Sequence, residues 1–353
     1  MNNVIKLTVP SRILPLEARI SALLAQFAEH RRGGDDVFWL KENAELLNIL
    51  ECTGQDVPQE ALVVHADFYN GAEKRLTFFP QYYRFLLSLA LDLEDLGMTG
   101  NRAERMVAFA HEQGLAGAEL SDLQRAEARR LMMRRDRDPL RDPGLDDRLR
   151  AFVNRTATFA LPNKKASYEL THIVYYLSEY GRRSPDLGQE AVESLHFTGL
   201  TAFLDQNADL LAEVCIALAY MGETPPTLWT AWLERETVGF VVEDGPAVPI
   251  NDHYHEFFVC NWHAAVTGQE IFRKPLSACR SRYERSLRPN NALREISQAL
   301  LEMDGARCGD WEIMRRRMEP ALSEQTLDIL QCASESSKAF EAFFEGFARA
   351  GVA

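Results

Sequence analysis

The sequence predicts an all-α protein made of repeated helical hairpins, with a closed α/α toroid favoured over an open α-solenoid. Nearly every long segment has apolar residues at helical spacing rather than in the alternation of a half-buried strand. Helix after helix ends in glycine, the residue that most readily adopts the left-handed C-terminal cap. These glycines recur at intervals of 37 to 46 residues, except for one interval of 84.

Six apolar helices are expected to end at such glycines, which are Gly54, Gly97, Gly181, Gly222, Gly268 and Gly305. The long interval is twice about 42, so one unit is missing near residue 139. There "LSDLQRAEARRLMMRRDRDP" predicts a helix that is stopped by Pro139 instead of glycine. The related phrases "ENAELLNIL" and "QNADLLAEV" support a repeat.

Shorter helices are predicted between the glycine-ended ones, at 16–31, 59–70, 102–113, 145–153, 188–197, 227–237 and 276–287, and a last helical stretch covers 310–348. The repeating unit is therefore a hairpin of about 42 residues, present about seven times, as in solenoids and rings. Strand-like alternation is limited to "VIKLTV" near the start and "VGFVVE" at 238–243.

A closed ring is favoured because the glycine-ended helices are apolar almost all round, as helices of an inner layer would be. The other helices are more amphipathic. Residues 1–353 are expected to form a single all-helical domain. The segment "DRDPLRDPGLDD" (136–147) is interpreted as a linker or insertion within that domain, not as a domain boundary.

Composition excludes several classes of function. The net charge of −13 disfavours binding to nucleic acid and docking on anionic lipid. No apolar run is long enough to span a membrane, and the start of the sequence lacks the apolar core of a signal peptide. The six scattered cysteines form no CxxC pair and are expected to be reduced thiols. A cytoplasmic protein is therefore expected.

Polar and titratable residues gather where the glycine-ended helices are expected to begin. These residues are Lys41, Glu42, Asn43 and Glu45; Gln81, Tyr82, Tyr83 and Arg84; Lys164, Lys165, Tyr168, Glu169 and His172; Asp205, Gln206, Asn207, Asp209 and Glu213; and Asp252, His253, His255 and Glu256. Helix caps account for part of this pattern, with Asn43, Asp205 or Asn207, and Asp252 as cap candidates. Caps do not account for the histidines, so one shared site at these helix starts is predicted.

Glu169 and His172 are three residues apart, so both side chains lie on one helix face and can share a ligand. His253 and His255 can converge only where a helix begins, as "PINDHYHEFF" indicates. Glu169, His172, His253 and His255 together are a candidate metal site for zinc or non-haem iron. Without a metal, Glu169, His172 and His255 are candidates for general acid and base catalysis.

Four further residues are candidate substrate contacts: Tyr168, Lys165, Asp209 and Arg84. Tyrosines are concentrated in the same helices, where packing explains most of them, although a cavity lined with them would also bind a small organic ligand. The arginine-rich run between 125 and 150 is interleaved with acids and is interpreted as a solvated helix face.

Several stretches resemble an uncharacterised alphaproteobacterial family, a domain of unknown function. They include "VFWLKENAELLNIL", "FFPQYYRFLLSLALDLEDLGM" and "LPNKKASYELTHIVYYLSEYGRR". The resemblance implies a bacterial cytoplasmic protein and carries no activity. "LTHIVYYLSEYG" also resembles a threonine–histidine helix of other uncharacterised helical bacterial proteins, which implies that His172 belongs to a site.

The sequence leaves three functional interpretations open. The first is an enzyme, metal-assisted or acid–base, that acts on a small polar or anionic metabolite or a peptide end. The second is a non-catalytic helical-repeat module that binds a ligand or a protein. The third is a sugar-active enzyme, since α/α toroids commonly host that chemistry, although no assigned acid and base carboxylates are visible in the sequence.

Overall fold

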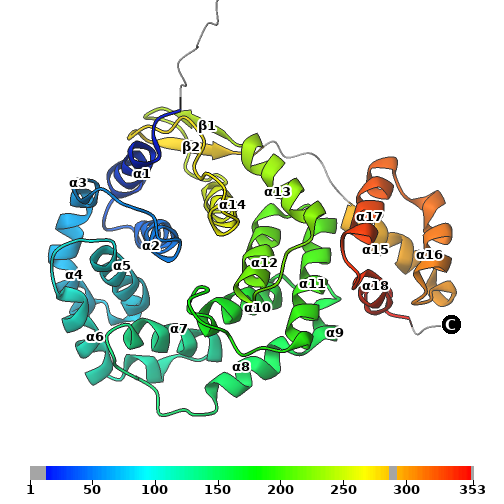
Figure 1. Cartoon of the computed structure of the whole chain (residues 1–353), viewed down its shortest axis with the longest axis horizontal. Helices are drawn as coiled ribbons and strands as arrows, with labels where there is room; N and C mark the ends of the chain where they lie inside the picture. The colour runs from blue at the N-terminus through cyan, green and yellow to red at the C-terminus, as the bar shows by residue number, and fades with distance from the viewer. Residues whose placement is uncertain (1–12, 286–291, 351–353) are drawn as a thin grey trace, which may run out of the picture.

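The computed structural model of the chain describes residues 13–285 and 292–350 and is all-helical apart from one two-stranded sheet (Figure 1). Six helices face the middle of the main body and are called the central helices below. They are α2 (Val37–Cys52), α5 (Tyr83–Asp95), α7 (Asp122–Met133), α10 (Lys164–Leu177), α12 (Ala208–Tyr220) and α14 (Tyr254–Val266). Each contacts the next along this series, and α14 also contacts α2.

The remaining helices of the main body pack on the outside of the central ones. They are α1 (Leu16–Ala25), α3 (Gln59–Leu62), α4 (Ala66–Phe78), α6 (Arg102–Glu112), α8 (Leu145–Val153), α9 (Thr156–Phe159), α11 (Gln189–Leu204) and α13 (Thr227–Gly239). A π-helical turn, Gln26–His30, continues α1, and short 3₁₀ turns lie at Val63–His65, Pro80–Tyr82, Leu115–Ala118, Asp304–Ala306 and Glu319–Ala321.

The predicted glycine caps are confirmed at five of the six positions. Gly54, Gly97, Gly181, Gly222 and Gly268 all have positive φ at the ends of central helices. Gly305 does not, because the preceding Asp304 takes the left-handed conformation there. The helix predicted to stop at Pro139 stops earlier, at Met133, because Asp136 at φ 54° takes the place of the glycine.

Polar side chains begin the central helices. Asp36, Ser121, Asn163 and Asn207 accept hydrogen bonds from backbone N–H groups of the first turns of α2, α7, α10 and α12. Asn207 was an expected cap. Asn43 is not a cap, because α2 begins six residues before it, and its buried amide instead donates to the carbonyls of Phe27 and Trp39.

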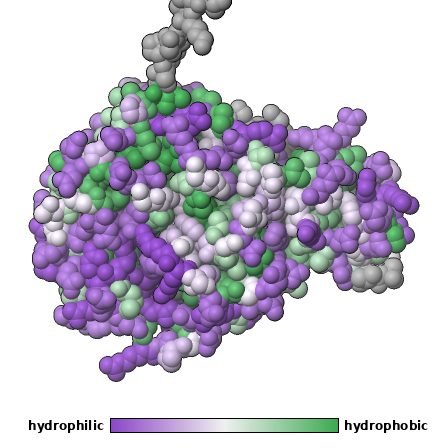
Figure 2. Space-filling view, in the orientation of Figure 1, coloured by the Kyte–Doolittle hydropathy of each residue, from purple (hydrophilic) through white to green (hydrophobic). Residues whose placement is uncertain are grey.

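The strands are β1 (Val241–Asp244) and β2 (Ser281–Glu284), which pair antiparallel. β1 overlaps the predicted strand at 238–243. The helix predicted for 276–287 is wrong, since its described part holds β2, whose alternate side chains are buried. The predicted strand at 4–9 lies outside the described residues. On the face shown in Figure 2, hydrophobic side chains gather near the strands and α1, and most of the remaining rim is hydrophilic.

Buried Arg31 joins the first and last central helices. Its guanidinium donates to Glu42 of α2 at 3.2 Å and to both carboxylate oxygens of Asp252 before α14, at 2.9 and 3.0 Å. It also donates to the Ser281 carbonyl of β2 at 2.8 Å. Since every guanidinium nitrogen is used, this ion-pair network fixes how α2, α14 and the sheet meet.

The C-terminal helices α15 (Ala292–Glu302), α16 (Trp311–Met318), α17 (Glu324–Ser336) and α18 (Phe340–Ala348) form a group beside α11 and α13 (Figure 1). The predicted helical stretch 310–348 is thus three helices. The indole N–H of Trp229 donates to the Ser336 hydroxyl at 2.9 Å, and Phe197 packs edge-on against Phe343. These contacts attach the group outside the central helices, away from the candidate site described below.

Candidate functional site

A cavity of about 360 Å³ lies among the central helices. Each helix contributes at least one polar lining side chain: Glu45 from α2, Arg84 from α5, Glu127 from α7, His172 from α10, Glu213 from α12 and His255 from α14. Aromatic residues toward the C-terminal ends of the helices complete its wall. The polar residues therefore converge in the N-terminal and middle parts of the central helices.

His255 and Asp209 form the charged pair of the site. The Nδ1–H of His255 donates to Oδ1 of Asp209 at 2.8 Å, and the Tyr168 hydroxyl donates to Oδ2 of the same carboxylate at 2.7 Å. The other imidazole nitrogen lies 3.7 Å from Glu45. Burial opposes the charge on His255, but the bond to Asp209 outweighs it and raises the pKa of His255 to about 9. Despite its own burial, Asp209 has a lowered pKa for the same reason.

His172 and Glu213 form a second pair with the opposite preference. Nε2 of His172 lies 3.7 Å from Oε2 of Glu213, which also accepts a bond from the Thr171 hydroxyl at 2.5 Å. Burial, reinforced by nearby Asp209, raises the pKa of Glu213 to about 8. Burial also lowers the pKa of His172, and the His255 cation adds to that effect.

These pKa shifts favour the ionised forms of His255 and Asp209 and the uncharged forms of His172 and Glu213. The side chain of His172 is 38% exposed, and it lines the cavity rather than a closed core. Neighbouring titratable groups whose pKa values are shifted in opposite directions are typical of sites that carry out acid–base catalysis. The cavity therefore holds a proton donor and a proton acceptor at neutral pH.

The four predicted metal ligands do not meet. His172 and His255 line the cavity, whereas Glu169 lies to one side of it with its carboxylate 3.9 Å from exposed Lys165. His253 precedes the first turn of α14, and its Nδ1 contacts Glu256 at 3.1 Å.

Over the ranges 13–285 and 292–350, no group of three or more histidine, cysteine, aspartate or glutamate side chains could hold a metal ion. The donor set predicted for zinc or non-haem iron is therefore not assembled there. His255 has its Nδ1 committed to Asp209, and the nearest partner of His172 is a carboxyl group favoured in its neutral form. A neutral carboxyl group is a poor metal ligand.

The candidate substrate contacts fall in different places. Tyr168 and Asp209 hold each other and His255, as described above. Arg84 lines the cavity, where its guanidinium bonds Glu119 at 2.9 Å and pairs with Glu127. Lys165 does not contribute, because its side chain is 86% exposed and lies beside Glu169 outside the cavity.

Sequence reasoning gave no role to Glu213, Glu45 or Arg130. Glu213 lies four residues after Asp209, one helical turn along the same face of α12, and that spacing was a usable signal. Arg130 was assigned to a solvated helix face, yet its side chain is only 4% exposed. It lies four residues after buried Ala126 and shares the apolar face of α7.

Tyrosines and a tryptophan close the inner part of the cavity. Tyr180 stacks on Trp262 with ring centres 5.7 Å apart, and Tyr175 packs against both rings. Tyr180 belongs to an unusual turn after α10, in which Glu179, Tyr180 and Gly181 all have positive φ. Left-handed backbone at two non-glycine residues is strained, and such strain concentrates at functional sites.

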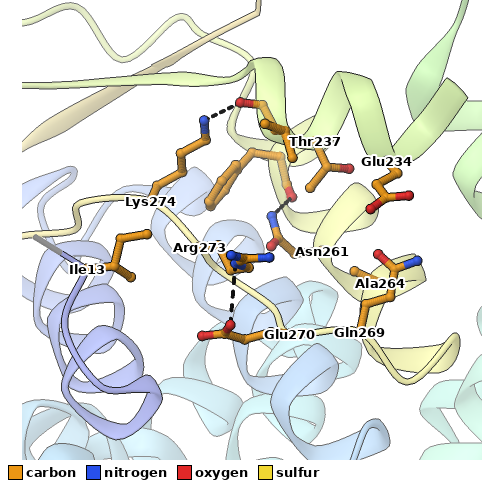
Figure 3. Close-up of a pocket in the computed structure, with 11 residues that line it drawn as sticks. Ile13, Glu234, Thr237, Asn261, Ala264, Gln269, Glu270, Arg273 and Lys274 are labelled. Atoms are coloured by element: carbon orange, nitrogen blue, oxygen red, sulfur yellow. Dashed lines mark hydrogen bonds and ion pairs between the residues drawn. The ribbon is translucent and has the colours of Figure 1, made fainter. Parts of the chain in front are cut away.

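A second cavity of about 470 Å³ lies between α13, α14 and the segment 269–274 (Figure 3). Three of its charged residues are engaged with neighbours: Arg273 pairs with Glu270, and the Lys274 ammonium donates to the Val238 carbonyl at 2.5 Å. The described residues that line it include no histidine. The cavity among the central helices is smaller but is lined by two histidines as well as carboxyl groups, and it is the candidate site.

These features define an all-helical protein with a cavity of titratable and aromatic residues at its centre. Residues 1–350 match the family described as Domain of unknown function (DUF6902), and the chain belongs to that family. No curated protein and no solved structure matches the chain. None of the helices in the described residues is both long and apolar enough to cross a membrane.

Proposed function

We propose that the chain is an enzyme that uses general acid–base catalysis on a small organic ligand held in the cavity among the central helices. One observation carries the proposal: two histidine–carboxyl pairs with opposite protonation preferences face the same cavity. A binding module has no need of a buried carboxyl group kept protonated beside a neutral imidazole.

The residues divide into distinct roles. Glu213 keeps its proton at neutral pH and donates it to the ligand, while neutral His172 accepts a proton. The His255 cation, held by Asp209, stabilises negative charge that develops on the ligand. Tyr168 fixes Asp209 and thereby the orientation of the His255 ring. Tyr168 and Asp209 are positioning residues.

We also propose that the main body is an α/α toroid of about 42-residue hairpins rather than an open α-solenoid. Two observations support this: the left-handed glycines near the ends of the central helices, and the contacts of α14 with α2. In a toroid the N-terminal parts of all central helices open on one side. That arrangement gathers polar side chains from units far apart in the sequence.

Sugar chemistry is a second candidate, favoured by one observation: Glu45 and Glu213 both line the cavity that Trp262 helps to close. Glycoside hydrolysis requires one protonated and one ionised carboxyl group on opposite sides of the bond that is cleaved. Glu213 would be the protonated partner. Release of reducing sugar from aryl glycosides, lost in Glu45→Gln and Glu213→Gln, would distinguish this reaction.

The test of acid–base catalysis follows a mixture of small metabolites in D₂O by NMR, with the whole chain. The wild type is expected to convert a component or exchange its carbon-bound protons. Glu213→Gln and His172→Asn are expected to slow that reaction by about 100-fold or more. The matched control, His253→Asn, removes a histidine outside the cavity and is expected to retain the rate within about threefold.

A second measurement needs no substrate. In histidine-labelled protein, His255 is expected to titrate near pH 9, and His172 is expected to be neutral at pH 7. If both rings titrate together near their ordinary value, the opposite protonation preferences do not exist and the proposal fails. A metabolite that binds in the cavity without any chemical change identifies a binding module instead.

A further inference from the structure

Arg130 of α7 is a buried cation with unused hydrogen-bonding capacity. It lines the cavity, its side chain is only 4% exposed, and its Nε and Nη2 have no hydrogen-bond partner. The carboxylate of Glu179 lies 3.1 Å from Nε, close enough for an ion pair but without hydrogen-bond geometry. Buried N–H donors without partners are rare and require an explanation.

Two other arginines with little exposure, Arg31 and Arg134, have both terminal guanidinium nitrogens donating to acceptors, whereas buried Arg19, like Arg130, keeps an Nε without a partner. Arg31 donates from Nε, Nη1 and Nη2 to two carboxylates and two backbone carbonyls. Arg134, one turn beyond Arg130 on α7, donates to Asp92 at 2.7 Å and to Asp95 at 2.6 Å. The fold is thus able to supply two acids to one arginine, and at Arg130 it leaves donors open.

The rings beside Arg130 lead to the proposed acid–base residues. The guanidinium of Arg130 lies 4.3 Å from the centre of the Tyr180 ring. Tyr180 contacts Tyr176 at 6.3 Å, and Tyr176 stacks on His172 at 6.0 Å. His172 and Tyr176 are one turn apart on α10, and the turn after α10 brings Tyr180 against Tyr176, so the three rings form a row along the cavity wall.

The strained turn after α10 sets the position of this row's inner end. Tyr180 at φ 53° is preceded by Glu179 at φ 49° and followed by Gly181 at φ 82°. A Cβ at Gly181 would come within 2.5 Å of the Tyr220 ring, so the turn is packed closely against α12. The same turn brings both Tyr180 and the Glu179 carboxylate to Arg130.

We propose that Arg130 binds the carboxylate of a small organic monoacid whose apolar body lies along the Tyr176 and Tyr180 rings. The other end of that ligand reaches His172 and Glu213. This assignment rests on the proposed function of the same cavity, and it names the class of substrate. Guanidinium and carboxylate groups match in geometry and form strong charge-assisted hydrogen bonds.

A single negative charge is favoured over the two charges of a phosphate monoester. Glu179 already lies beside the Arg130 guanidinium, and Glu127 lines the same cavity one turn earlier on α7. Arg84, the other guanidinium that lines the cavity, is paired with Glu119 and Glu127. The local positive charge that remains for a ligand is therefore small, and a dianion would be repelled.

The test measures binding of three probes to the whole chain by calorimetry and ligand-detected NMR: 3-phenylpropionate, its neutral primary amide, and 2-phenylethyl phosphate. The wild type is expected to bind the carboxylate about tenfold or more tightly than the amide and more tightly than the phosphate. Arg130→Met is expected to abolish the preference for carboxylate over amide. Arg129→Met, which removes the neighbouring charge on α7 that pairs with Asp146, is the matched control and retains the preference.

Arg130→Lys is a second variant that keeps the proposal testable if Arg130→Met does not fold. Because lysine keeps the positive charge, Arg130→Lys is expected to retain a reduced preference for the carboxylate over the amide. Equal binding of acid and amide, a preference that survives in Arg130→Met, or no binding of any probe overturns the proposal. Equal binding means that water alone satisfies the Arg130 donors. Tighter binding of the phosphate overturns the assignment to a monoacid.

Failure here is distinguishable from failure of the proposed function. The probes report binding, so their discrimination does not depend on catalysis. If carboxylate selectivity depends on Arg130 while no metabolite is converted, the anion site stands and the acid–base mechanism is wrong.

Discussion

Replacing Glu213 with glutamine tests the protonation state of the carboxyl group at the centre of the site. Burial and Asp209 raise the pKa of Glu213 from 4.5 to about 8 in the folded chain. Above pH 4.5 the unfolded chain therefore loses this proton while the folded chain keeps it. The contribution of Glu213 to stability is present below pH 4.5 and is lost as the pH rises toward 8. Glutamine does not titrate and avoids that loss.

The slope is about 1.4 kcal/mol per pH unit while the two states differ by one proton. Between pH 5 and pH 7, Glu213→Gln is expected to gain about 2.5 kcal/mol in free energy of unfolding relative to the wild type. The amide oxygen of glutamine can still accept the bond from the Thr171 hydroxyl, so packing changes little. A site residue whose replacement stabilises the fold is typical of a functional rather than a structural role.

The assay is urea unfolding of both proteins at pH 5, 6, 7 and 8. Glu169→Gln is the control for replacing a carboxyl group by an amide, since Glu169 is not among the residues that line the cavity and lies beside Lys165. A difference between Glu213→Gln and the wild type that stays constant from pH 5 to 8 would show that Glu213 is ionised in the folded chain. That result refutes its role as the proton donor.

Three further predictions concern the stability of the fold, each measured by urea unfolding. Arg31→Met is expected to lose about 3–5 kcal/mol, because it removes the guanidinium that pairs with both buried Asp252 and buried Glu42, and a loss below about 1 kcal/mol contradicts the Arg31 network. Burial lowers the pKa of both His65 and His263 to about 4. Their contribution to the free energy of unfolding is therefore fully present above pH 6.5 and decreases below it, by about 1 kcal/mol per histidine at pH 5.5. A free energy of unfolding that does not change from pH 7 to pH 5 contradicts this. Gly181→Ala is expected to destabilise more than Gly222→Ala, because both need positive φ but only Gly181 faces a ring at 2.5 Å; equal losses contradict the packing of the turn.

Local rules predicted much of the fold. Helical periodicity and glycine caps depend on neighbours within a few residues, and they located the central helices at five of the six glycines. The C-terminal end of α7 was missed because Asp136 replaces glycine in the left-handed position, which acidic residues adopt less often. The segment at 276–287 was missed because β2 is short and its partner β1 lies about 40 residues earlier in the chain.

The candidate site was predicted less completely, because it depends on which side of each helix faces inward. His172, His255, Asp209 and Arg84 were identified from their phase in the repeat. Asp209 contacts His255, and the other three line one cavity. Glu169 and His253 share the same phase but are not among the residues that line the cavity; Glu169 lies beside Lys165, and His253, just before α14, contacts Glu256, and sequence spacing does not show these contacts. The role of Glu213 depends on Asp209 and burial, which only the packed structure reveals.

Three features that oppose stability meet in one place. Glu213 is buried at the cavity wall, Arg130 holds donors without partners, and residues 179–181 form a left-handed turn beneath them. They come from α12, α7 and the end of α10, so no single local constraint of the chain produces all three. If the central helices served only to hold the body together, apolar residues and a relaxed turn would be more stable at each position. Their coincidence around one cavity is the strongest physical argument that this cavity binds and transforms a ligand.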